Sequence, residues 1–497
     1  MLRFAPAMRL CPTLATALSL TLLGCGSEPV VQPAAALDRE ALLDPTACAA
    51  CHPNHYAEWS GSMHAYAADD PVFLAMNARG QRETGGALGS FCVKCHAPLA
   101  VRLGLTTDGS NLAELPQKLK GVTCFFCHSV DEVGGAHDAP LRLATDGVLR
   151  GEIADPLGDA AHASAYSPLH DRDRAASATL CGSCHDIVTP GGAHLERTFE
   201  EWQASVFAQP SKGLACGQCH MDGRDDVASS VAGSPPRRVH AHDFPGVDVA
   251  LSPFARSAEQ AALVQAQLDT RTLQAALCVK QVPGGAAIEV VLDNVGAGHG
   301  FPSGATQDRR AWVEVRAWAG ATLVYQSGVV PDDEPVAGLA DPDLWLVRDC
   351  IFDAAGKQVT TFWTTTSYES NQLPAAVTSD ASDPAFYRTH VAWTYPRRPS
   401  GATTAPTTAQ PDRVTMRVRM RPIDHEVLGE LVATGDLDPA VAARVRTFDL
   451  ASTVLEWTPA TATLHYQEGA DLVDCVSRGL PGGRSATPAP THTRCGP

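Results

Sequence analysis

No internal stretch of this sequence approaches the ~20 consecutive apolar residues that a membrane-spanning helix needs, although 44% of its 497 residues are hydrophobic. Positive charge is also scarce, because 38 lysines and arginines stand against 55 acidic residues and leave a net charge of −17. These shortages argue against an integral membrane protein and against nucleic acid or an anionic lipid surface as the main partner. Cysteine, by contrast, is abundant, with 16 residues whose spacing is informative.

The first residues have the pattern of an export signal. Arg3 and Arg9 form a basic start, and residues 14–23 form an apolar run that is too short to span a bilayer. The run ends in Leu22-Leu23-Gly24-Cys25, which resembles the lipobox of bacterial lipoproteins and implies a lipid on Cys25. The alternative is an ordinary signal peptide with a cysteine at this position by chance. Since Gly26 follows instead of the aspartate that retains lipoproteins at the inner membrane, we expect a periplasmic or cell-surface protein anchored to the outer membrane, in an oxidising compartment.

Ten cysteines occur in five Cys-x-x-Cys-His motifs, the attachment signature of haem c. Two thiols on one helical turn can form thioether bonds to one porphyrin, and the adjacent histidine binds its iron. A zinc ribbon would not need a histidine after every Cys-x-x-Cys pair, so the repetition favours haem. The predicted attachment sites for five haems are Cys48, Cys51, Cys92, Cys95, Cys124, Cys127, Cys181, Cys184, Cys216 and Cys219. The predicted proximal iron ligands are His52, His96, His128, His185 and His220.

Four further cysteines lie outside these motifs and the export signal: Cys278, Cys350, Cys475 and Cys495. An even number in an oxidising compartment suggests disulfides. A Cys475–Cys495 bond closing a loop in the tail is the natural expectation, although spacing alone does not determine the connectivity.

The composition changes along the chain and suggests five segments. These are a signal peptide (1–24), a Pro/Ala-rich tether (25–45), a pentahaem domain (46–250), a β-sandwich-like domain (251–470) and a Cys-containing tail (471–497). In the haem segment we expect a helix from Asn54 to about Ala67, and another that opens with a capping box at Thr198–Glu201.

The second half has the pattern of antiparallel strands. Apolar runs at 272–282 and 287–294 flank Pro283-Gly284-Gly285, which predicts a hairpin. Residues 313–318 and 414–420 alternate with period two, which predicts half-buried strands. We therefore predict an α+β protein: a loop-rich, mostly helical multihaem domain wrapped on stacked haems, followed by an antiparallel β-sandwich-like domain.

Several segments resemble the cytochrome c-552/4 (cytochrome c-554 and c-prime) family. They are CAACHPNHYAEWSGSMH (48–64), GVTCFFCHSV (121–130), LCGSCHDIVTPGGAHLERTFEEW (180–202) and LACGQCHM (214–221), with HAHDF (240–244) and GHGFPSG (298–304) recurring in larger members. The resemblance covers roughly 46–310. It implies electron transfer through haems with two histidine ligands, and an accessory role for the β domain. Some relatives, including hydroxylamine oxidoreductase and tetrathionate reductase, are enzymes, so the resemblance leaves activity open.

The second, distal ligand of each iron decides the mechanism, because a haem with two axial histidines has no vacancy for substrate. The candidate distal ligands are His64, His170, His240, His242 and His299. Reserve candidates are His55, His137, His162 and His194. The remaining histidines lie far from the motifs and are expected at the surface: His390, His425, His465 and His492.

The sequence therefore predicts an exported electron carrier between redox partners such as other cytochromes, quinol oxidation systems or terminal reductases. The acidic surface would favour partners with basic patches, and the membrane is contacted only through the lipid. Two alternatives stay open: an oxidoreductase acting on a small nitrogen or sulfur compound at one five-coordinate haem, and a subunit of an extracellular cytochrome assembly. No Cys-x-x-Cys-Lys motif is present, and no acid/base cluster is evident in the haem region.

Overall fold

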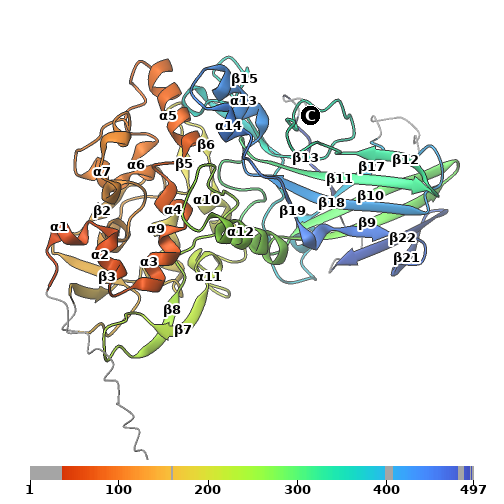
Figure 1. Cartoon of the computed structure of the whole chain (residues 1–497). Helices are drawn as coiled ribbons and strands as arrows, with labels where there is room; N and C mark the ends of the chain where they lie inside the picture. Colours follow the sequence, from red (N-terminus) through yellow and green to blue (C-terminus); the bar gives the residue numbers. More distant parts are fainter. Residues whose placement is uncertain (1–35, 158–160, 398–406, 479–485, 493, 495–497) are drawn as a thin grey trace, which may run out of the picture.

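The computed structural model describes residues 36–157, 161–397, 407–478, 486–492 and 494. The predicted signal peptide and the lipidation site Cys25 lie outside the described residues. Figure 1 shows two parts side by side: a region of short helices that contains the motifs, and a β domain of long strands, with helix α12 (Ser257–Arg271) between them. The chain has the α+β organisation that the sequence predicts.

The motif region, residues 36–250, is built from short helices and small two-stranded sheets. Several helices begin with an aspartate cap and a proline in the first turn, as at Asp44-Pro45 and Asp70-Pro71, a pairing that satisfies the first amides and sets the backbone angle. The helices are α1 (Arg39–Leu42), α2 (Pro45–Ala49), α3 (Pro53–Ser60), α4 (Met63–Tyr66), α5 (Pro71–Glu83), α6 (Val93–His96), α7 (Pro98–Arg102), α8 (Cys124–Ser129), α9 (Ala178–Gly182), α10 (Thr198–Gln203) and α11 (Gly217–His220), with 3-10 turns η1 (Leu112–Glu114), η2 (Gln117–Leu119) and η3 (Ala175–Ser177). The strands are β1 (Val130–Val133), β2 (Leu141–Leu143), β3 (Val148–Gly151), β4 (Ala163–Tyr166), β5 (Ile187–Val188), β6 (His194–Leu195), β7 (Gly223–Val227) and β8 (Pro236–His240), paired in sequence order.

Two local expectations in this region differ from the structure. The folded body begins within the expected tether, because α1 lies there and Leu42 and Leu43 are buried in the core. The helix expected from Asn54 to Ala67 is broken after Ser60. There Gly61 ends α3, and the side chain of Ser62 accepts a hydrogen bond from the amide of Ala65 to start α4.

The β domain, residues 251–492, is a sandwich of two sheets. One sheet has the order β21-β22-β9-β10-β17-β23, and the other has the order β12-β11-β18-β19 with β13 beside β11 and β20 beside β18. A core that includes Leu277, Val290, Val313, Val418 and Trp457 lies between them. The strands are β9 (Leu273–Val282), β10 (Gly285–Asn294), β11 (Arg310–Ala319), β12 (Thr322–Ser327), β13 (Leu346–Val347), β14 (Asp349–Phe352), β15 (Gln358–Val359), β16 (Ser367–Ser370), β17 (His390–Tyr395), β18 (Arg413–Arg421), β19 (Phe448–Asp449), β20 (Leu455–Trp457), β21 (Leu464–Glu468), β22 (Asp471–Arg478) and β23 (Thr487–Pro488). The helices and turns are α13 (His425–Ala433), α14 (Pro439–Ala442), η4 (Phe362–Thr364), η5 (Pro384–Thr389) and η6 (Ala451–Thr453).

The predicted hairpin is confirmed, since β9 and β10 pair antiparallel around Pro283-Gly284. The two alternating segments also pair, with Val313 opposite Val418. Within 313–318 the inward residues Val313, Val315 and Ala317 are buried and Arg316 and Trp318 are partly exposed, although Glu314 is also buried. The preceding outward residue, Trp312, is buried because it packs against Val330, Val336 and other residues of the following connection. That connection covers a face which the alternation alone assigns to solvent.

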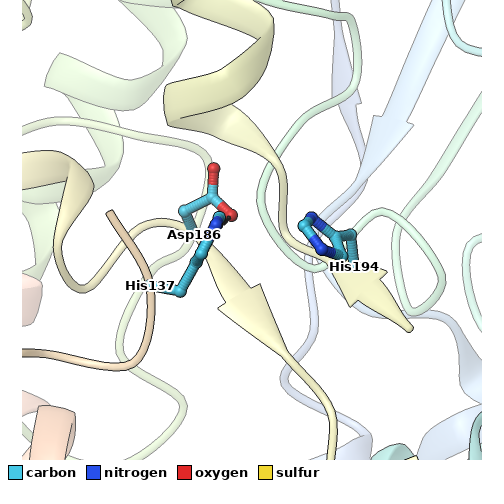
Figure 2. Close-up of side chains that lie close together, drawn as sticks. All are labelled: His137, Asp186 and His194. Carbon is cyan, nitrogen blue, oxygen red and sulfur yellow. Dashed lines mark hydrogen bonds and ion pairs between the residues drawn. The ribbon is translucent and has the colours of Figure 1, made fainter. Parts of the chain in front are cut away.

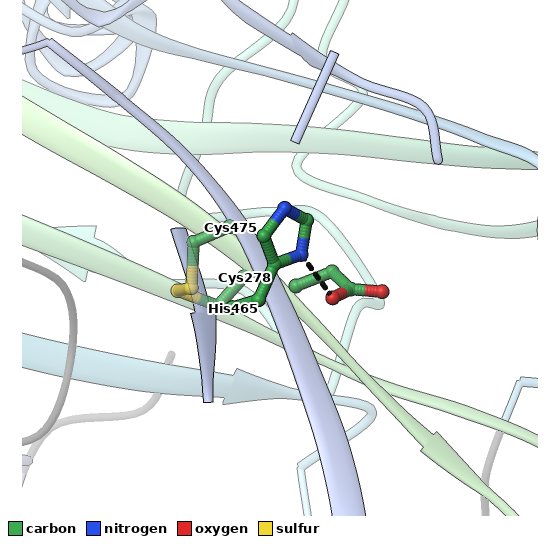
Figure 3. The surroundings of a disulfide bond; sticks show 4 residues. Cys278, His465 and Cys475 are labelled. Atoms are coloured by element: carbon green, nitrogen blue, oxygen red, sulfur yellow. Dashed lines mark hydrogen bonds and ion pairs between the residues drawn. A yellow bond between two sulfur atoms is a disulfide. The ribbon is translucent and has the colours of Figure 1, made fainter. Parts of the chain in front are cut away.

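The tail contributes to the sandwich, and its disulfide differs from the expected one. β22 lies between β21 and β9, with Cys475 directly opposite Cys278, and these two residues form the disulfide (Figure 3). The Cys475–Cys495 expectation is therefore wrong, because it treated sequence proximity as spatial proximity. Cys350 is also disulfide-bonded.

Among the helices of the described ranges, none combines the length and the apolar character needed to cross a membrane.

Candidate haem sites

Four of the five motif histidines share one local geometry. In each of them the ring nitrogen Nδ1 lies within hydrogen-bond distance of a backbone carbonyl from a remote segment. The pairs are His52 with Ala228 (2.6 Å), His96 with Ala67 (2.9 Å), His128 with Arg150 (2.5 Å) and His220 with Pro245 (2.7 Å). A carbonyl only accepts, so Nδ1 must carry the proton and donate it. The tautomer is thereby set, with the Nε2 lone pair available to a metal ion.

Four of the five motif histidines also face a second histidine. A histidine nitrogen binds a metal ion at about 2.0 Å, so two imidazoles on opposite sides of one iron have ring centroids about 6.2 Å apart. The observed separations are 6.1 Å for His52 and His162, 6.2 Å for His185 and His64, 6.3 Å for His128 and His242, and 6.4 Å for His220 and His299. Each pair leaves the space that an iron between two histidines requires.

The structure therefore separates the distal candidates. His64, His242 and His299 each lie 6.2 to 6.4 Å from a motif histidine. His170 and His240 form no pair at this separation among the described residues. His170 lies 5.7 Å from His128, but its Nε2 is hydrogen-bonded to the carbonyl of Cys127 at 2.8 Å. The Nδ1 of His240 pairs with Glu152 at 2.5 Å, and its buried Nε2 has no hydrogen-bond partner, so ligation by His240 stays a prediction.

His162, ranked only as a reserve, takes the position opposite His52. It lies just before β4, which pairs with β3, and the chain around it, LGDAAHASA (157–165), carries no motif that would single it out. Of the other reserves, His55 also lies near His52, with 6.2 Å between the ring centroids and 74° between the ring planes, and it meets His242 edge-on at 4.9 Å. His137 and His194 lie next to each other.

Burial keeps two of the distal candidates, His64 and His242, in the neutral form that metal binding requires. Desolvation, followed by the neighbouring His185 and His220, lowers the pKa of His64 from 6.5 to about 3. Burial is also the main reason that the pKa of His242 lies well below its ordinary value. At neutral pH both imidazoles are unprotonated and able to ligate.

His96 is different from the other four. Among the described residues, which include all 18 histidines of the chain, no second imidazole faces it. The ring that contacts it belongs to Phe73 on α5, which is stacked on His96 with a centroid separation of 4.0 Å and an interplanar angle of 3°. An apolar phenyl ring supplies no iron ligand.

Acidic groups with raised pKa values lie near this same motif, although no acid/base cluster is evident in the sequence of the haem region. Burial first, and then the carboxylate of Glu196, raise the pKa of Cys92 to about 12. Burial raises the pKa of Glu196 itself to about 7, although the positive charge of Arg309 opposes that shift. Arg309 forms a bidentate ion pair with Asp248 at 3.0 and 2.9 Å, and Asp308 is also buried, with a pKa raised to about 7. These residues come from separate segments, so no local motif reveals the cluster.

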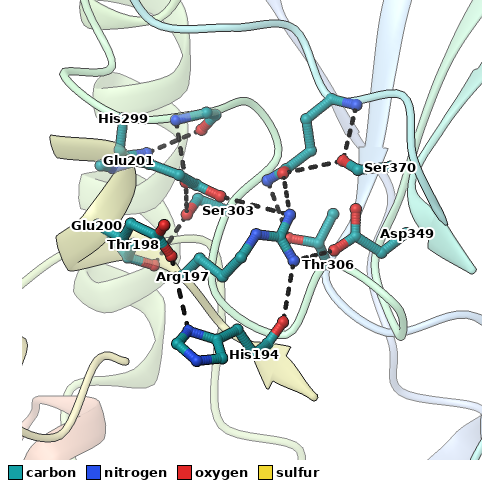
Figure 4. Close-up of polar contacts among 12 residues, drawn as sticks. His194, Arg197, Thr198, Glu200, Glu201, His299, Ser303, Thr306, Asp349 and Ser370 are labelled. Atoms are coloured by element: carbon teal, nitrogen blue, oxygen red, sulfur yellow. Dashed lines mark hydrogen bonds and ion pairs between the residues drawn. The ribbon is translucent and has the colours of Figure 1, made fainter. Parts of the chain in front are cut away.

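The loop that carries His299 is held against the motif region by α10 (Figure 4). Glu201 Oε2 accepts hydrogen bonds from the amide of Gly300 at 3.0 Å and the hydroxyl of Ser303 at 2.6 Å. Thr198 Oγ1 lies 2.8 Å from the same hydroxyl. The predicted capping box is therefore wrong, because the side chains of Thr198 and Glu201 contact the His299 loop and do not cap α10. The buried carboxylate of Asp186 accepts a hydrogen bond from the amide of Glu200 in the first turn.

Two of the four histidines expected at the surface are buried. His390 pairs with Asp293 at 2.9 Å inside the β domain, and the side chain of His492 is only 9% exposed. His390 is the first residue of β17, and His492 follows β23. His465 is exposed, as expected.

Residues 47–129 match the family model described as cytochrome c554 and c-prime, and this segment contains the first three motifs. Together with the five motifs, this match identifies the chain as a multihaem c-type cytochrome with a C-terminal β domain.

The fold is similar to that of a penta-heme cytochrome c552 from Thermochromatium tepidum, with a TM-score of 0.55 and 20% sequence identity over 86% of this chain and 100% of that chain. No curated protein matches the sequence.

Proposed function

We propose that the chain carries five covalently bound haems c and transfers electrons between redox partners. The observation that carries this proposal is the set of four histidine pairs at 6.1 to 6.4 Å, each containing one motif histidine. Haem c, when bound, supplies one-electron iron chemistry. The chain holds each porphyrin through two thioethers, orients the proximal imidazole through its Nδ1 hydrogen bond, and excludes small ligands with the second imidazole.

The closeness of several motifs supports electron transfer between neighbouring haems. The thiol of Cys48 lies close to that of Cys124, Cys95 lies close to Cys184, and Cys181 lies close to Cys216. These contacts join the motifs of the first and third haems, the second and fourth, and the fourth and fifth. The ten motif cysteines form no disulfides, so all remain available for attachment.

The proposal extends to export and anchoring. The amino-terminal pattern and the absence of a long apolar run favour a periplasmic or surface protein held by a lipid on Cys25, and the net charge of −17 favours partners with basic patches. Metabolic labelling with palmitate tests the anchor. We expect the label to disappear in Cys25→Ser, and a label retained by that variant would refute the lipidation.

Haem stoichiometry and electron paramagnetic resonance test the central proposal. Iron and pyridine-haemochrome analysis should give five haems per chain. In the oxidised protein, haems with two histidine ligands give low-spin signals, and we expect four of the five irons to be low-spin. A count below five, or several high-spin irons, would contradict the assignment.

A second candidate function rests on His96. Because no second imidazole faces this residue among the described residues, the haem attached at 92–96 is the candidate for an open coordination position. Glu196, close to Cys92, offers a buried acid there. An oxidoreductase acting on a small nitrogen or sulfur compound would show a high-spin signal that changes on addition of nitrite, hydroxylamine or cyanide. A high-spin signal insensitive to all three would leave electron transfer as the function.

A further inference from the structure

Two histidines that pair with no motif histidine, and an aspartate, converge in the motif region (Figure 2). They are His137 from the connection between β1 and β2, Asp186 directly after the fourth motif, and His194 at the start of β6. One ligand atom from each lies within 4.8 Å of the other two. The Nδ1 of His137 is 2.7 Å from Oδ1 of Asp186, and the His137 and His194 rings are 5.0 Å apart.

The surrounding backbone holds the three residues in place. The amides of Asp138 and Ala139 donate to the carbonyls of Asp186 and Ser183, at 3.3 and 2.7 Å, and so fasten the His137 connection to the fourth motif. His194 is paired with Val188 in the β5–β6 hairpin. The three ligand-bearing segments are therefore positioned before any ion binds, which reduces the entropy cost of assembling a site.

The carboxylate of Asp186 is oriented toward the histidines. Its side chain is fully buried, and its second oxygen, Oδ2, accepts a hydrogen bond from the amide of Glu200 at 3.1 Å, so Oδ1 faces His137. The carboxylate of Glu200 itself lies 3.8 Å from Nδ1 of His194. His137 and His194 are partly exposed, at 37% and 44%, which gives an ion a route from solvent.

We propose that His137, Asp186 and His194 bind one divalent first-row transition metal ion, with Zn²⁺ as the best match, and that Glu200 is a candidate fourth ligand. Two imidazoles and a carboxylate are a ligand set that zinc and ferrous iron use, whereas calcium and magnesium prefer oxygen alone. Ligand bonds of about 2.0 Å place tetrahedral ligand atoms about 3.3 Å apart. The ligand atoms lie up to 4.8 Å apart in the structure, and rotation of the partly exposed His194 side chain would bring its nitrogen closer to the other two.

The alternative is that His137 and Asp186 are simply a hydrogen-bonded pair. The chain contains a matched example of such a pair in the β domain, where Nδ1 of His465 lies 2.7 Å from Oδ1 of Asp474 beside the Cys278–Cys475 disulfide (Figure 3). Among the described residues, no third metal-ligating side chain joins that pair. The difference between the two sites is His194, which makes His194 the residue to test.

The bound ion would connect three segments of the haem region. One of them carries His185, the neighbour of Asp186, so the ion would stabilise the segment that presents this histidine. We expect zinc to raise the thermal midpoint of the haem-loaded protein, because it binds the folded and not the unfolded arrangement.

The experiment uses the haem-loaded full chain, treated with chelator and then dialysed against micromolar Zn²⁺, with zinc counted per protein by mass spectrometry. We expect one zinc per chain in the parent and in His465→Ala, and at least about tenfold weaker binding in His194→Ala and His137→Ala. An unchanged Soret spectrum in each variant shows that the haem fold is intact.

X-ray absorption at the zinc edge should show nitrogen and oxygen neighbours, with the outer-shell scattering of two imidazoles and no sulfur. Absence of retained zinc in the parent would overturn the proposal. Retention unchanged by both His194→Ala and His137→Ala would also overturn it, since the ion would then lie elsewhere.

Discussion

The imidazole of His299, on a loop of the β domain, lies nearly parallel to that of His220, with 6.4 Å between the ring centroids and 11° between the ring planes. His220 ends the fifth motif, and its Nδ1 is occupied by the carbonyl of Pro245. With iron between them, the fifth haem would be held by both parts of the chain. The β domain would then be a component of the redox centre itself.

We expect His299→Ala to convert one haem of the five from low spin to high spin, because the variant removes the sixth ligand. Electron paramagnetic resonance of the oxidised protein measures this change. His425→Ala, at an exposed residue of the β domain whose Nε2 contacts the carbonyl of Asp332, serves as the control and should leave the spectrum unchanged. A spectrum of His299→Ala with the same proportion of high-spin iron as the parent would show that His299 is not a ligand.

The two histidines His162 and His170 give opposite expectations. His162 faces His52 at 6.1 Å, whereas Nε2 of His170 is hydrogen-bonded to Cys127, so His162→Ala should create a high-spin haem and His170→Ala should not. The same spectroscopy distinguishes them. If His170→Ala alone produced the high-spin signal, the distal assignment at the first and third motifs would have to be revised.

A buried ion pair fastens α10 to the β domain. Arg197 Nη1 donates to Asp349 Oδ2 at 2.8 Å, with both side chains almost fully buried, and the guanidinium lies 4.1 Å from the ring centre of Tyr368. Arg197→Gln leaves the Asp349 carboxylate without its buried cation, and we expect a loss of about 3–5 kcal/mol in the free energy of unfolding. Chemical denaturation followed by tryptophan fluorescence measures the loss.

The Arg82–Asp436 pair, whose arginine side chain is 53% exposed, is the control, because it also joins the motif region to the β domain. Arg82 is solvent-exposed, so its contribution is screened, and Arg82→Gln should have a much smaller effect. Equal losses in the two variants would contradict a special role for burial at Arg197.

Glu289 on β10 predicts a pH dependence of stability. Burial first, and then the nearby Glu468, raise its pKa from 4.5 to about 7. The folded chain therefore binds more protons than the unfolded chain between these values, so this group lowers the free energy of unfolding as the pH rises from about 4.5 to about 7.

Glu289→Gln removes the titrating carboxyl group and with it this pH-dependent fall in the free energy of unfolding. We expect the variant to match the parent near pH 4 and to exceed its stability at pH 8, on the order of 1–3 kcal/mol. Thermal midpoints across this range measure the effect. A variant whose advantage were constant with pH would show that Glu289 does not titrate as described.

The sequence determined the features that depend on near neighbours in the chain. Cysteines and histidine within one helical turn define each haem attachment site, and the alternation around Pro283-Gly284 predicts the β9–β10 hairpin, because both signals are local. The export pattern ending at Cys25 is local as well.

Only the tertiary structure decided which histidine faces which motif. The sequence favoured His170 as a distal ligand and kept His162 as a reserve, yet the pairing of β3 with β4 places His162 near His52. The same holds for Cys475, whose partner Cys278 is separated from it by 197 positions but lies directly opposite on the neighbouring strand. Ligand pairs, disulfides and buried acidic clusters join remote segments, and their geometry depends on how the whole chain packs and not on spacing within it.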